Sequence, residues 1–444
     1  TQRRSSCSCY TPEFRAHGTT RDCHHSRPPP LECPLSLRSR GGSLARSMTP
    51  QWLTILLTSV TLVACTGLGD SPFENAPTPG PDAGSGLEPD LEVGRLFAES
   101  QSFRRTVLEQ SLVDHSIGYS TLRLENYATS DAGWDPLPPW NPKVAGVVVD
   151  DLGDLSHASG LEAFTIPEGW DRQELLALGR RAFDEYPLGI NSLARSLADL
   201  ETARSYGMWI DDRTRVGGFT RVEASPGYIA LAYTCSSCHG RVDREAGPLI
   251  RGVANPTLDI GRILTDEATA AGVTPDPTWL GYGPGLVDVT NDTTNDPLGI
   301  PDLRPVRYQN HINASASVRN DLAALTVRVD TLFITNNSFK RPPRKLVFAV
   351  ALFLWSLGEE QEASPLSAAA KTGREVFEQT CARCHHHDGT TEDPLAVATV
   401  GTDPESASSP MRGTGDYRIP SLFMVADRKR LLHRSHIGTL EELL

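Results

Sequence analysis

Two short segments of the chain carry cysteine and histidine at a spacing that could do chemistry. Both contain the pattern C-x-x-C-H, in which two cysteines three positions apart are followed at once by a histidine. The residues are Cys235, Cys238 and His239 in the first motif, and Cys381, Cys384 and His385 in the second. Two thiols at this spacing could join the two vinyl groups of a porphyrin, and the imidazole could ligate its iron. The pattern therefore predicts two covalently bound haem c groups, with the cysteines as attachment points and the histidines as iron ligands.

The residues before each motif repeat a four-residue step. Gly227 and Leu231 precede the first motif at this step, and Gly373 and Phe377 precede the second. Residues four apart share one face of an α-helix. We therefore expect a short helix to lead into each motif, with the glycine allowing another helix to approach and the larger side chain lying beside the haem.

Three other interpretations of the cysteines are open. Two C-x-x-C pairs could give four thiolates to a zinc ion, a single pair could be a thioredoxin-like redox motif, and each pair could form a simple disulfide. Zinc does not explain a histidine directly after each pair, and a redox pair needs a surrounding βαβ pattern that the sequence lacks. Haem is therefore the favoured cofactor, and a non-catalytic zinc protein is a third hypothesis.

Composition and charge limit the possible partners. The chain has 444 residues, of which 39% are hydrophobic and 22% charged, so it is long enough for two or three domains. Its net charge is −13. Nucleic-acid binding needs a basic surface, so this charge argues against such a partner. An acidic surface favours a redox partner protein with a basic surface.

The N-terminal region has the composition of an export signal rather than of a folded domain. Residues 1–47 are rich in Arg, Ser and Pro, and we interpret them as a disordered or spurious leader before Met48. The apolar run that follows is too short to span a bilayer and ends in small residues, as in a signal peptide over residues 48–64. The tetrapeptide LVAC resembles a bacterial lipobox, which implies lipidation of Cys65.

The sequence after this cysteine predicts a tether and then a folded body. Residues 65–92 are rich in Gly, Pro and Asp and are expected to be flexible. Residues 93–159 form an N-terminal extension to which we assign no role. The expected location is the periplasmic side of the bacterial cell envelope, with the membrane reached by the lipid anchor only.

The sequence resembles the c-type cytochromes, and more closely the di-haem cytochrome c peroxidase-like superfamily. The resemblance rests on TCSSCHG at 234–240, TCARCH at 380–385 and IPSLFMVADRKRLLHRSHIGTLEELL at 419–444. In that superfamily a V-P-x-L-R-N-V-like segment leads to a histidine-containing loop and then to a helix that starts T-L-E-E. His433 falls at the position of that histidine. The resemblance covers residues 170–444.

An internal repeat gives the same organisation independently. The segment IPDLRPVRYQN at 300–310 mirrors IPSLFMVADRK at 419–429, with I-P-x-L-x-x-V in common. Each half of the chain thus runs from a C-x-x-C-H motif to this segment, as expected after a duplication. The resemblance and the repeat imply a mainly α fold, with two cytochrome c-like helical haem domains in tandem at 160–358 and 365–444, joined by a linker at 359–364.

Two further stretches predict helices, and the second of them has no counterpart in the second half of the chain. Patterning over 172–206 predicts an amphipathic helix, and the apolar run LVFAVALFLWSLG at 346–358 predicts the terminal helix of the first domain, with Trp355 in the core. The second domain has no counterpart of this run. We therefore expect it to be truncated at residue 444.

The sixth iron ligands decide between electron transfer and catalysis. Met411 and Met424 are candidate ligands of the second haem. Between His239 and Cys381 there is no methionine and a single histidine, His311. His311 could be a distal ligand, an acid–base residue above an open iron, or a solvated loop histidine.

The sequence therefore supports two functions. The first is an exported di-haem cytochrome that transfers electrons, with peroxidase-like activity at a weakly ligated first haem and a small oxidant such as peroxide as substrate. The alternative is a di-haem oxygenase-like enzyme, similar to the di-haem rubber oxygenases.

Overall fold

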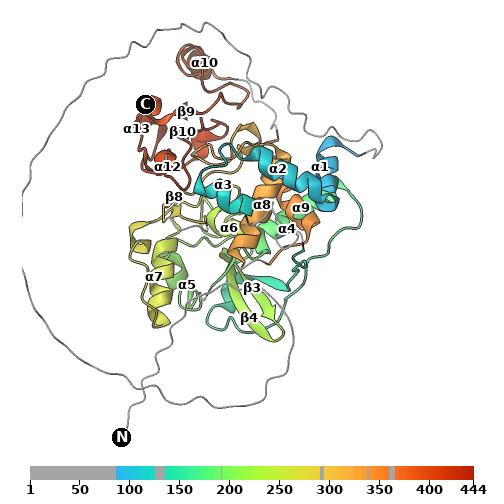
Figure 1. Ribbon diagram of the computed structural model, residues 1–444. Helices are drawn as coiled ribbons and strands as arrows, with labels where there is room; N and C mark the ends of the chain where they lie inside the picture. Colours follow the sequence, from blue (N-terminus) through green and yellow to red (C-terminus); the bar gives the residue numbers. More distant parts are fainter. Residues whose placement is uncertain (1–86, 126–135, 192, 291–294, 338–339, 360–365) are drawn as a thin grey trace, which may run out of the picture. The chain divides into compact units, whose positions relative to one another are not determined.

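The fold is taken from a computed structural model of the chain, shown in Figure 1. The structure describes residues 87–125, 136–191, 193–290, 295–337, 340–359 and 366–444. The predicted leader, signal peptide and lipidation site at Cys65 lie outside these residues, as does most of the linker. Within the described ranges, no helix is both long and apolar enough to cross a membrane.

Helices account for the larger part of the regular structure. The α-helices are α1 (Pro89–Glu99), α2 (Gln101–Ser111), α3 (Gly118–Arg123), α4 (Arg172–Glu185), α5 (Leu200–Ser205), α6 (Cys235–Cys238), α7 (Ile260–Ala270), α8 (Leu322–Asn336), α9 (Arg344–Ser356), α10 (Ala368–Thr380), α11 (Val397–Val400), α12 (Glu405–Ser408) and α13 (Leu440–Leu443). The 3₁₀ helices are η2 (Val149–Asp151), η3 (Trp279–Gly281), η4 (Val306–Tyr308) and η5 (Val425–Asp427).

Antiparallel sheets make the fold mixed α/β, so the predicted mainly α fold is wrong. The strands are β1 (Val144–Val148), β2 (Gly189–Asn191), β3 (Arg215–Ser225), β4 (Tyr228–Tyr233), β5 (Gly240–Arg241), β6 (Ile250–Arg251), β7 (Leu286–Val287), β8 (Leu298–Gly299), β9 (Leu395–Ala396) and β10 (Asp416–Tyr417). They form one four-stranded sheet in the order β1-β3-β4-β2 and three two-stranded sheets. The structure is 39% helical and 15% strand.

The four-stranded sheet was missed because its longest strand does not alternate. Seven consecutive residues of β3 are buried, so apolar side chains are not confined to every second position. Strand β4 returns beside β3 in a hairpin, with Phe219 opposite Tyr233. The turn of this hairpin contains Gly227, whose φ of 78° lies in the left-handed region. The sheet therefore occupies the part of the chain where a helix was expected before the first motif.

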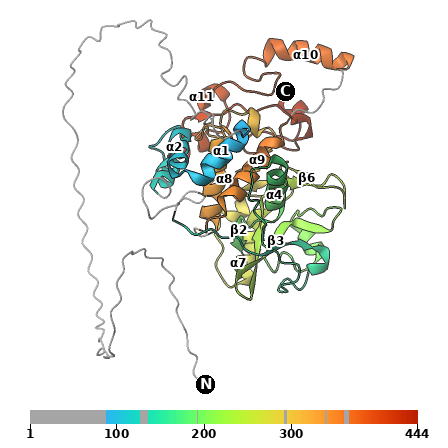
Figure 2. The same cartoon turned by 90° about the vertical axis from the view of Figure 1, so that its right-hand side faces the viewer.

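The helical core is built around α9, which is the predicted apolar helix. Side chains from Leu346 to Leu354 are all buried, because α4, α8 and α1 pack around the helix. These helices lie together in both views (Figures 1 and 2). Burying each large apolar side chain contributes about 1.5–3 kcal/mol. Trp355, predicted to be core, is partly buried against this cluster.

A glycine sets the contact between α4 and α9. A Cβ at Gly179 would lie 1.9 Å from the carbonyl oxygen of Ala349, so only glycine fits. One turn later Phe183 is fully buried and packs edge-on against Phe353, with ring centroids 5.5 Å apart. The predicted helix over 172–206 therefore exists as α4, but it ends at Glu185 and is followed by β2 and α5.

The N-terminal extension belongs to the same core. Helix α1 packs against α8 and α9, and α2 packs against α8. Strand β1 pairs with β3, with Val144 opposite Val222. Helix α1 begins at Pro89, inside the segment expected to be a tether, and buries Leu91. The folded body therefore starts earlier than the sequence suggested.

The two copies of the internal repeat share several backbone features at corresponding positions. Each I-P-x-L-x-x-V segment ends in a 3₁₀ turn, η4 in the first copy and η5 in the second. Ten residues after each valine a non-glycine residue has positive φ, Ala316 at 52° and Ser435 at 53°. The next helix is capped by a side chain that accepts from the N3 amide, Asp321 for α8 and Thr439 for α13. This agreement supports a duplicated element.

Candidate functional site

The first C-x-x-C-H motif forms a single helical turn, α6. The amide of His239 donates to the carbonyl of Cys235 at 2.9 Å, which closes the turn that carries all three residues of the motif. Its backbone is tied down by neighbours: the indole of Trp209 donates to Ser236 O at 3.1 Å, and the amide of Asn255 donates to Cys238 O at 2.8 Å. The motif is therefore held by tertiary contacts as well as by its own turn.

The four-stranded sheet supplies the seat for this turn. Gly218 in β3 has a φ of 68°, and a Cβ there would lie 2.4 Å from the amide nitrogen of Ser237. Its carbonyl accepts hydrogen bonds from the hydroxyls of Thr234 at 2.6 Å and Ser237 at 2.7 Å. Glycine at this position lets α6 dock directly on the strand. The sheet that the sequence analysis missed is thus the element that positions the first motif.

His239 is oriented by a backbone carbonyl far along the chain. Its Nδ1 lies 3.0 Å from the carbonyl oxygen of Pro301, the proline of the first I-P-x-L-x-x-V segment. A carbonyl can only accept, so Nδ1 carries the proton and Nε2 keeps a free lone pair. Burial lowers the pKa of His239 to about 4, which keeps the imidazole neutral. A neutral imidazole with a fixed tautomer is the form that binds metal.

The second motif repeats this geometry. Helix α10 ends at Thr380, and the amide of His385 donates to Cys381 O at 3.0 Å. The Nδ1 of His385 lies 3.0 Å from the carbonyl oxygen of Pro420, the proline of the second I-P-x-L-x-x-V segment. Burial also lowers the pKa of His385. Both histidines therefore present Nε2 in the same protonation state.

The four thiols are free and form two separate pairs. None of them is in a disulfide, so the simple-disulfide interpretation is wrong. Burial raises the pKa values of Cys235 and Cys238 to about 12, so both are neutral thiols. No group of three or more His, Cys, Asp or Glu side chains in the described ranges has the geometry of a metal site.

The arrangement fits a haem at each motif. Two thiols and one imidazole lie on a single turn, and the imidazole contacts Pro301 through Nδ1, which leaves Nε2 as its metal-binding nitrogen. Each histidine needs only one iron bond, so the absence of a larger cluster of donors is compatible with haem. The same donor set is present twice, which fits two groups rather than one shared metal.

The prediction of a helix directly before the first motif is wrong. The helix of the first half that corresponds to α10 lies earlier in the chain. Gly227 lies in the hairpin turn and Leu231 lies in β4. The helix that corresponds to α10 is α4, in which Gly179 and Phe183 reproduce the G-x-x-x-F spacing. An inserted segment with β2, α5, β3 and β4 separates this helix from its C-x-x-C-H motif. The shared G-x-x-x-F pattern was the signal that could have identified it.

Pro301 and Pro420 were also missed as functional residues. Their segments mark the internal repeat in the sequence, but nothing in the pattern assigns the prolines a role. The structure shows that each proline carbonyl orients the histidine of its own half. The order of motif and I-P-x-L-x-x-V segment, which is the same in both halves of the chain, was the available signal.

His311 does not lie in a solvated loop, so that interpretation is wrong. It is buried, its Nδ1 lies 3.0 Å from Asn310 Oδ1, and its carbonyl accepts from Arg418 at 3.0 Å. Burial, reinforced by the positive charge of Arg319, lowers the pKa of His311 to about 4. Among the interactions of the described residues, none joins it to His239.

The two candidate methionine ligands have other surroundings. Met411 packs against the start of α3, where a Cβ at Gly118 would lie 2.5 Å from its Sδ. Met424 is half-buried and has a φ of 52° at the start of η5. No contact given by the described residues brings either sulfur to His385.

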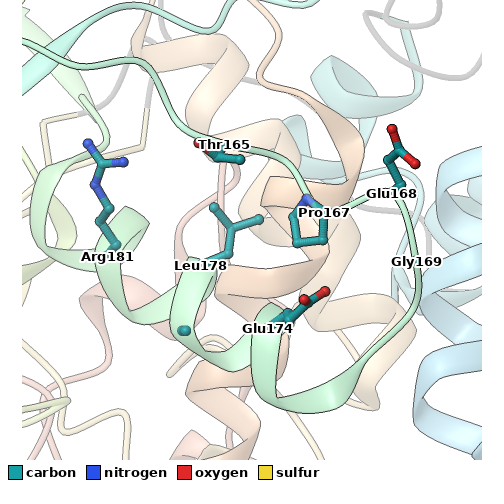
Figure 3. A pocket seen from close by; sticks show the side chains of 8 residues that line it. Thr165, Pro167, Glu168, Gly169, Glu174, Leu178 and Arg181 are labelled. Atoms are coloured by element: carbon teal, nitrogen blue, oxygen red, sulfur yellow. The ribbon is translucent and has the colours of Figure 1, made fainter.

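A pocket lies on α4 (Figure 3). It is lined by Thr165, Pro167, Glu168, Gly169, Glu174, Ala177, Leu178 and Arg181. None of these residues belongs to a C-x-x-C-H motif or to an I-P-x-L-x-x-V segment. The pocket therefore adds nothing to the candidate site.

The site is accordingly defined by its own geometry. No known protein family, curated protein or solved structure matches the chain.

Proposed function

We propose that the protein is an exported di-haem c-type cytochrome that transfers electrons. The observation that carries this proposal is the matched pair of histidines. Each follows a C-x-x-C turn, and each has its Nδ1 3.0 Å from the proline carbonyl of its own repeat. A redox thiol pair, or a zinc site made of the four thiolates alone, gives the histidines no role and so does not explain why the same hydrogen bond occurs twice.

The protein's own groups have clear roles in this function. Cys235, Cys238, Cys381 and Cys384 would hold the haem groups through their vinyl substituents, each sulfur bonding to one vinyl carbon while the thiol proton goes to the neighbouring carbon. The bound haem supplies a one-electron centre. His239 and His385 each present a neutral Nε2 to the iron, while the proline carbonyls fix the ring orientation and increase the basicity of the ligand.

Peroxidase-like activity at the first haem is a second candidate. The chain between His239 and Cys381 contains no methionine and only His311 as a histidine. The Nδ1 of His311 already faces Asn310, and its backbone carbonyl is held by Arg418. This inventory favours an open sixth position at the first haem, where a small oxidant such as peroxide could bind. Cyanide and peroxide titrations followed by absorption spectroscopy test it, and two low-spin haems that ignore both reagents would leave electron transfer alone.

The cysteines give the direct test of haem attachment. The full chain is produced in a bacterial host that matures c-type cytochromes, and haem is measured by pyridine haemochrome and by haem staining after denaturing electrophoresis. We expect two haems per chain in the parent and one in each double variant, Cys235→Ala/Cys238→Ala and Cys381→Ala/Cys384→Ala. Arg383→Ala is the matched control, because it changes an exposed residue inside the second motif and should leave both haems. A colourless protein that contains zinc would refute the proposal.

We also propose that the protein lies on the periplasmic side of the bacterial cell envelope, anchored by lipid at Cys65. The support is LVAC and the apolar run before it. Mass spectrometry of the mature N-terminus and detergent partitioning test the anchor. An unmodified N-terminus at another residue would contradict it.

A further inference from the structure

The two I-P-x-L-x-x-V segments contact each other in a pseudo-twofold arrangement. Each residue of the first segment corresponds to one 119 positions later, since Ile300 corresponds to Ile419. Arg304 pairs with Asp427 at 2.9 Å, and Tyr308 packs against Phe423 with ring centroids 5.0 Å apart. Adding 119 to 304 and to 308 gives 423 and 427. The ion pair and the aromatic pair therefore join the same two positions of the repeat, with the two copies exchanged, as in an isologous interface.

A second charged pair spans this junction between the two proline carbonyls. Asp302 directly follows Pro301, whose carbonyl holds His239. Arg428 comes from the other half and donates through Nη2 to the carbonyl of Ser421 at 2.7 Å. Ser421 directly follows Pro420, whose carbonyl holds His385. The Nε of Arg428 lies 3.9 Å from Asp302 Oδ2.

These contacts form an almost continuous chain of bonds and hydrogen bonds between the two histidines. It runs through the residues His239, Pro301, Asp302, Arg428, Ser421, Pro420 and His385. The only step longer than a hydrogen bond is the ion pair between Asp302 and Arg428. Electronic coupling falls steeply across each gap through space, so the 3.9 Å step between Asp302 and Arg428 limits this path.

The environment of the pair suits a fixed connection. The side chains of Asp302 and Arg428 are 4% and 13% exposed. The Nε of Arg428 is buried and has no hydrogen-bond acceptor among the described residues, while its Nη2 also donates to Phe423 O at 3.1 Å. Arg304 holds the Asp302 carboxylate from the other side at 2.6 Å. The carboxylate and the guanidinium are thus held in place without competing water.

We propose that Asp302 and Arg428 form the route by which single electrons pass between the two C-x-x-C-H sites. This inference rests on the proposed function. In each transfer one iron is oxidised from Fe(II) to Fe(III) and the other is reduced from Fe(III) to Fe(II), and no proton or group moves. Both residues act through the histidines and are therefore positioning residues.

The test separates the effect of the Asp302–Arg428 contact on the electron-transfer rate from the effect of the positive charge of Arg428. In the holoprotein, one haem is reduced by a flash-generated donor, and the rate of equilibration between the two haems is followed by absorption. Arg428→Lys keeps the positive charge but replaces the planar fork with a single ammonium group. We expect it to slow equilibration several-fold while the midpoint potentials stay near those of the parent. Arg428→Met should slow it at least as much and also shift the potentials.

The matched control is Phe423→Leu, which alters the same junction but leaves the backbone carbonyl that Arg428 contacts. It should keep the parental rate. Pyridine haemochrome is measured on every variant, so a protein without two haems refutes the proposed function rather than the route. Two haems with an unchanged rate in both Arg428 variants would overturn the route.

Discussion

The two C-x-x-C-H motifs share their local geometry but differ in what supports them. In both, the histidine amide closes the turn onto the first cysteine and Nδ1 meets a proline carbonyl at 3.0 Å. The first motif is seated on β3 and buries Cys238. The second follows directly from α10, a helix that buries none of its side chains. The turn and its histidine bond therefore do not depend on a particular surrounding scaffold.

The difference lies in the helix that precedes each motif. In the first half α4 is covered by α9, and an inserted sheet separates α4 from its motif. In the second half α10 runs straight into Cys381, and its glycine and phenylalanine meet no such partner. The same G-x-x-x-F pattern is thus seen once packed and once exposed, which makes the two glycines a matched pair for experiment.

The largest expected effect comes from alanine at these two glycines. Gly179→Ala places a Cβ 1.9 Å from the carbonyl oxygen of Ala349. The overpacking should lower the free energy of unfolding by about 1–3 kcal/mol, even after the gain in helix propensity. At Gly373 a Cβ meets nothing within 4 Å. Gly373→Ala should therefore stabilise α10 by about 0.5–1 kcal/mol. Urea denaturation of the full chain measures both.

The opposite sign at Gly373 would break the comparison. If Gly373→Ala also destabilised the protein, the face of α10 that carries Phe377 would be covered in solution, as the corresponding face of α4 is. A leucine at the same position distinguishes a tolerant exposed surface from a close helix contact, because its larger side chain would be accepted only in the first case.

Acid should weaken the fold through histidines whose pKa the fold lowers. Burial lowers the pKa of His239 to about 4, whereas an unfolded histidine titrates near 6.5. Between these values the unfolded chain binds a proton that the folded chain does not. Stability is therefore lost as the pH falls from about 6.5 to about 4. Urea midpoints of haem-free protein across this range measure the slope.

A variant assigns this slope to the first site. His239→Gln removes the group that resists protonation, so it should flatten the pH dependence in that range. The same slope in the variant and the parent would show that other groups, such as His311 with its similarly lowered pKa, dominate acid unfolding.

The smallest effect is expected at the junction between the halves. Phe423→Leu removes the aromatic contact with Tyr308 and should cost about 0.5–1.5 kcal/mol. Phe423→Tyr keeps the ring and serves as the control. A larger loss that appears as two separate unfolding transitions would mean that this contact, rather than the shared ion pairs, holds the two regions together.

The helices could be predicted from the sequence where one periodicity dominated. The apolar run at 346–358 gave α9, and the pattern before Cys381 gave α10. Both depend on local spacing, which a single sequence displays directly. The internal repeat also led to the two segments that the structure shows each ending in a 3₁₀ turn.

The hairpin before the first motif could not be recognised from the spacing used. Gly227, Leu231 and Cys235 are four apart, and four is also an even number, so such residues share one face of a strand as well as of a helix. The Pro226–Gly227 pair marks a turn and was the better signal. The bonds from the histidines to Pro301 and Pro420 join residues 62 and 35 positions apart, so only the fold could reveal them.

The acceptor of each histidine bond belongs to the main chain, which makes it insensitive to genetic change. Every amino acid carries a carbonyl, so no replacement of Pro301 or Pro420 deletes the group that meets Nδ1. A saturation screen at these prolines would report the loss of ring rigidity and leave the bond itself unseen. The orientation of both histidines therefore depends on the path of the backbone, and neighbouring side chains can change without removing the acceptor.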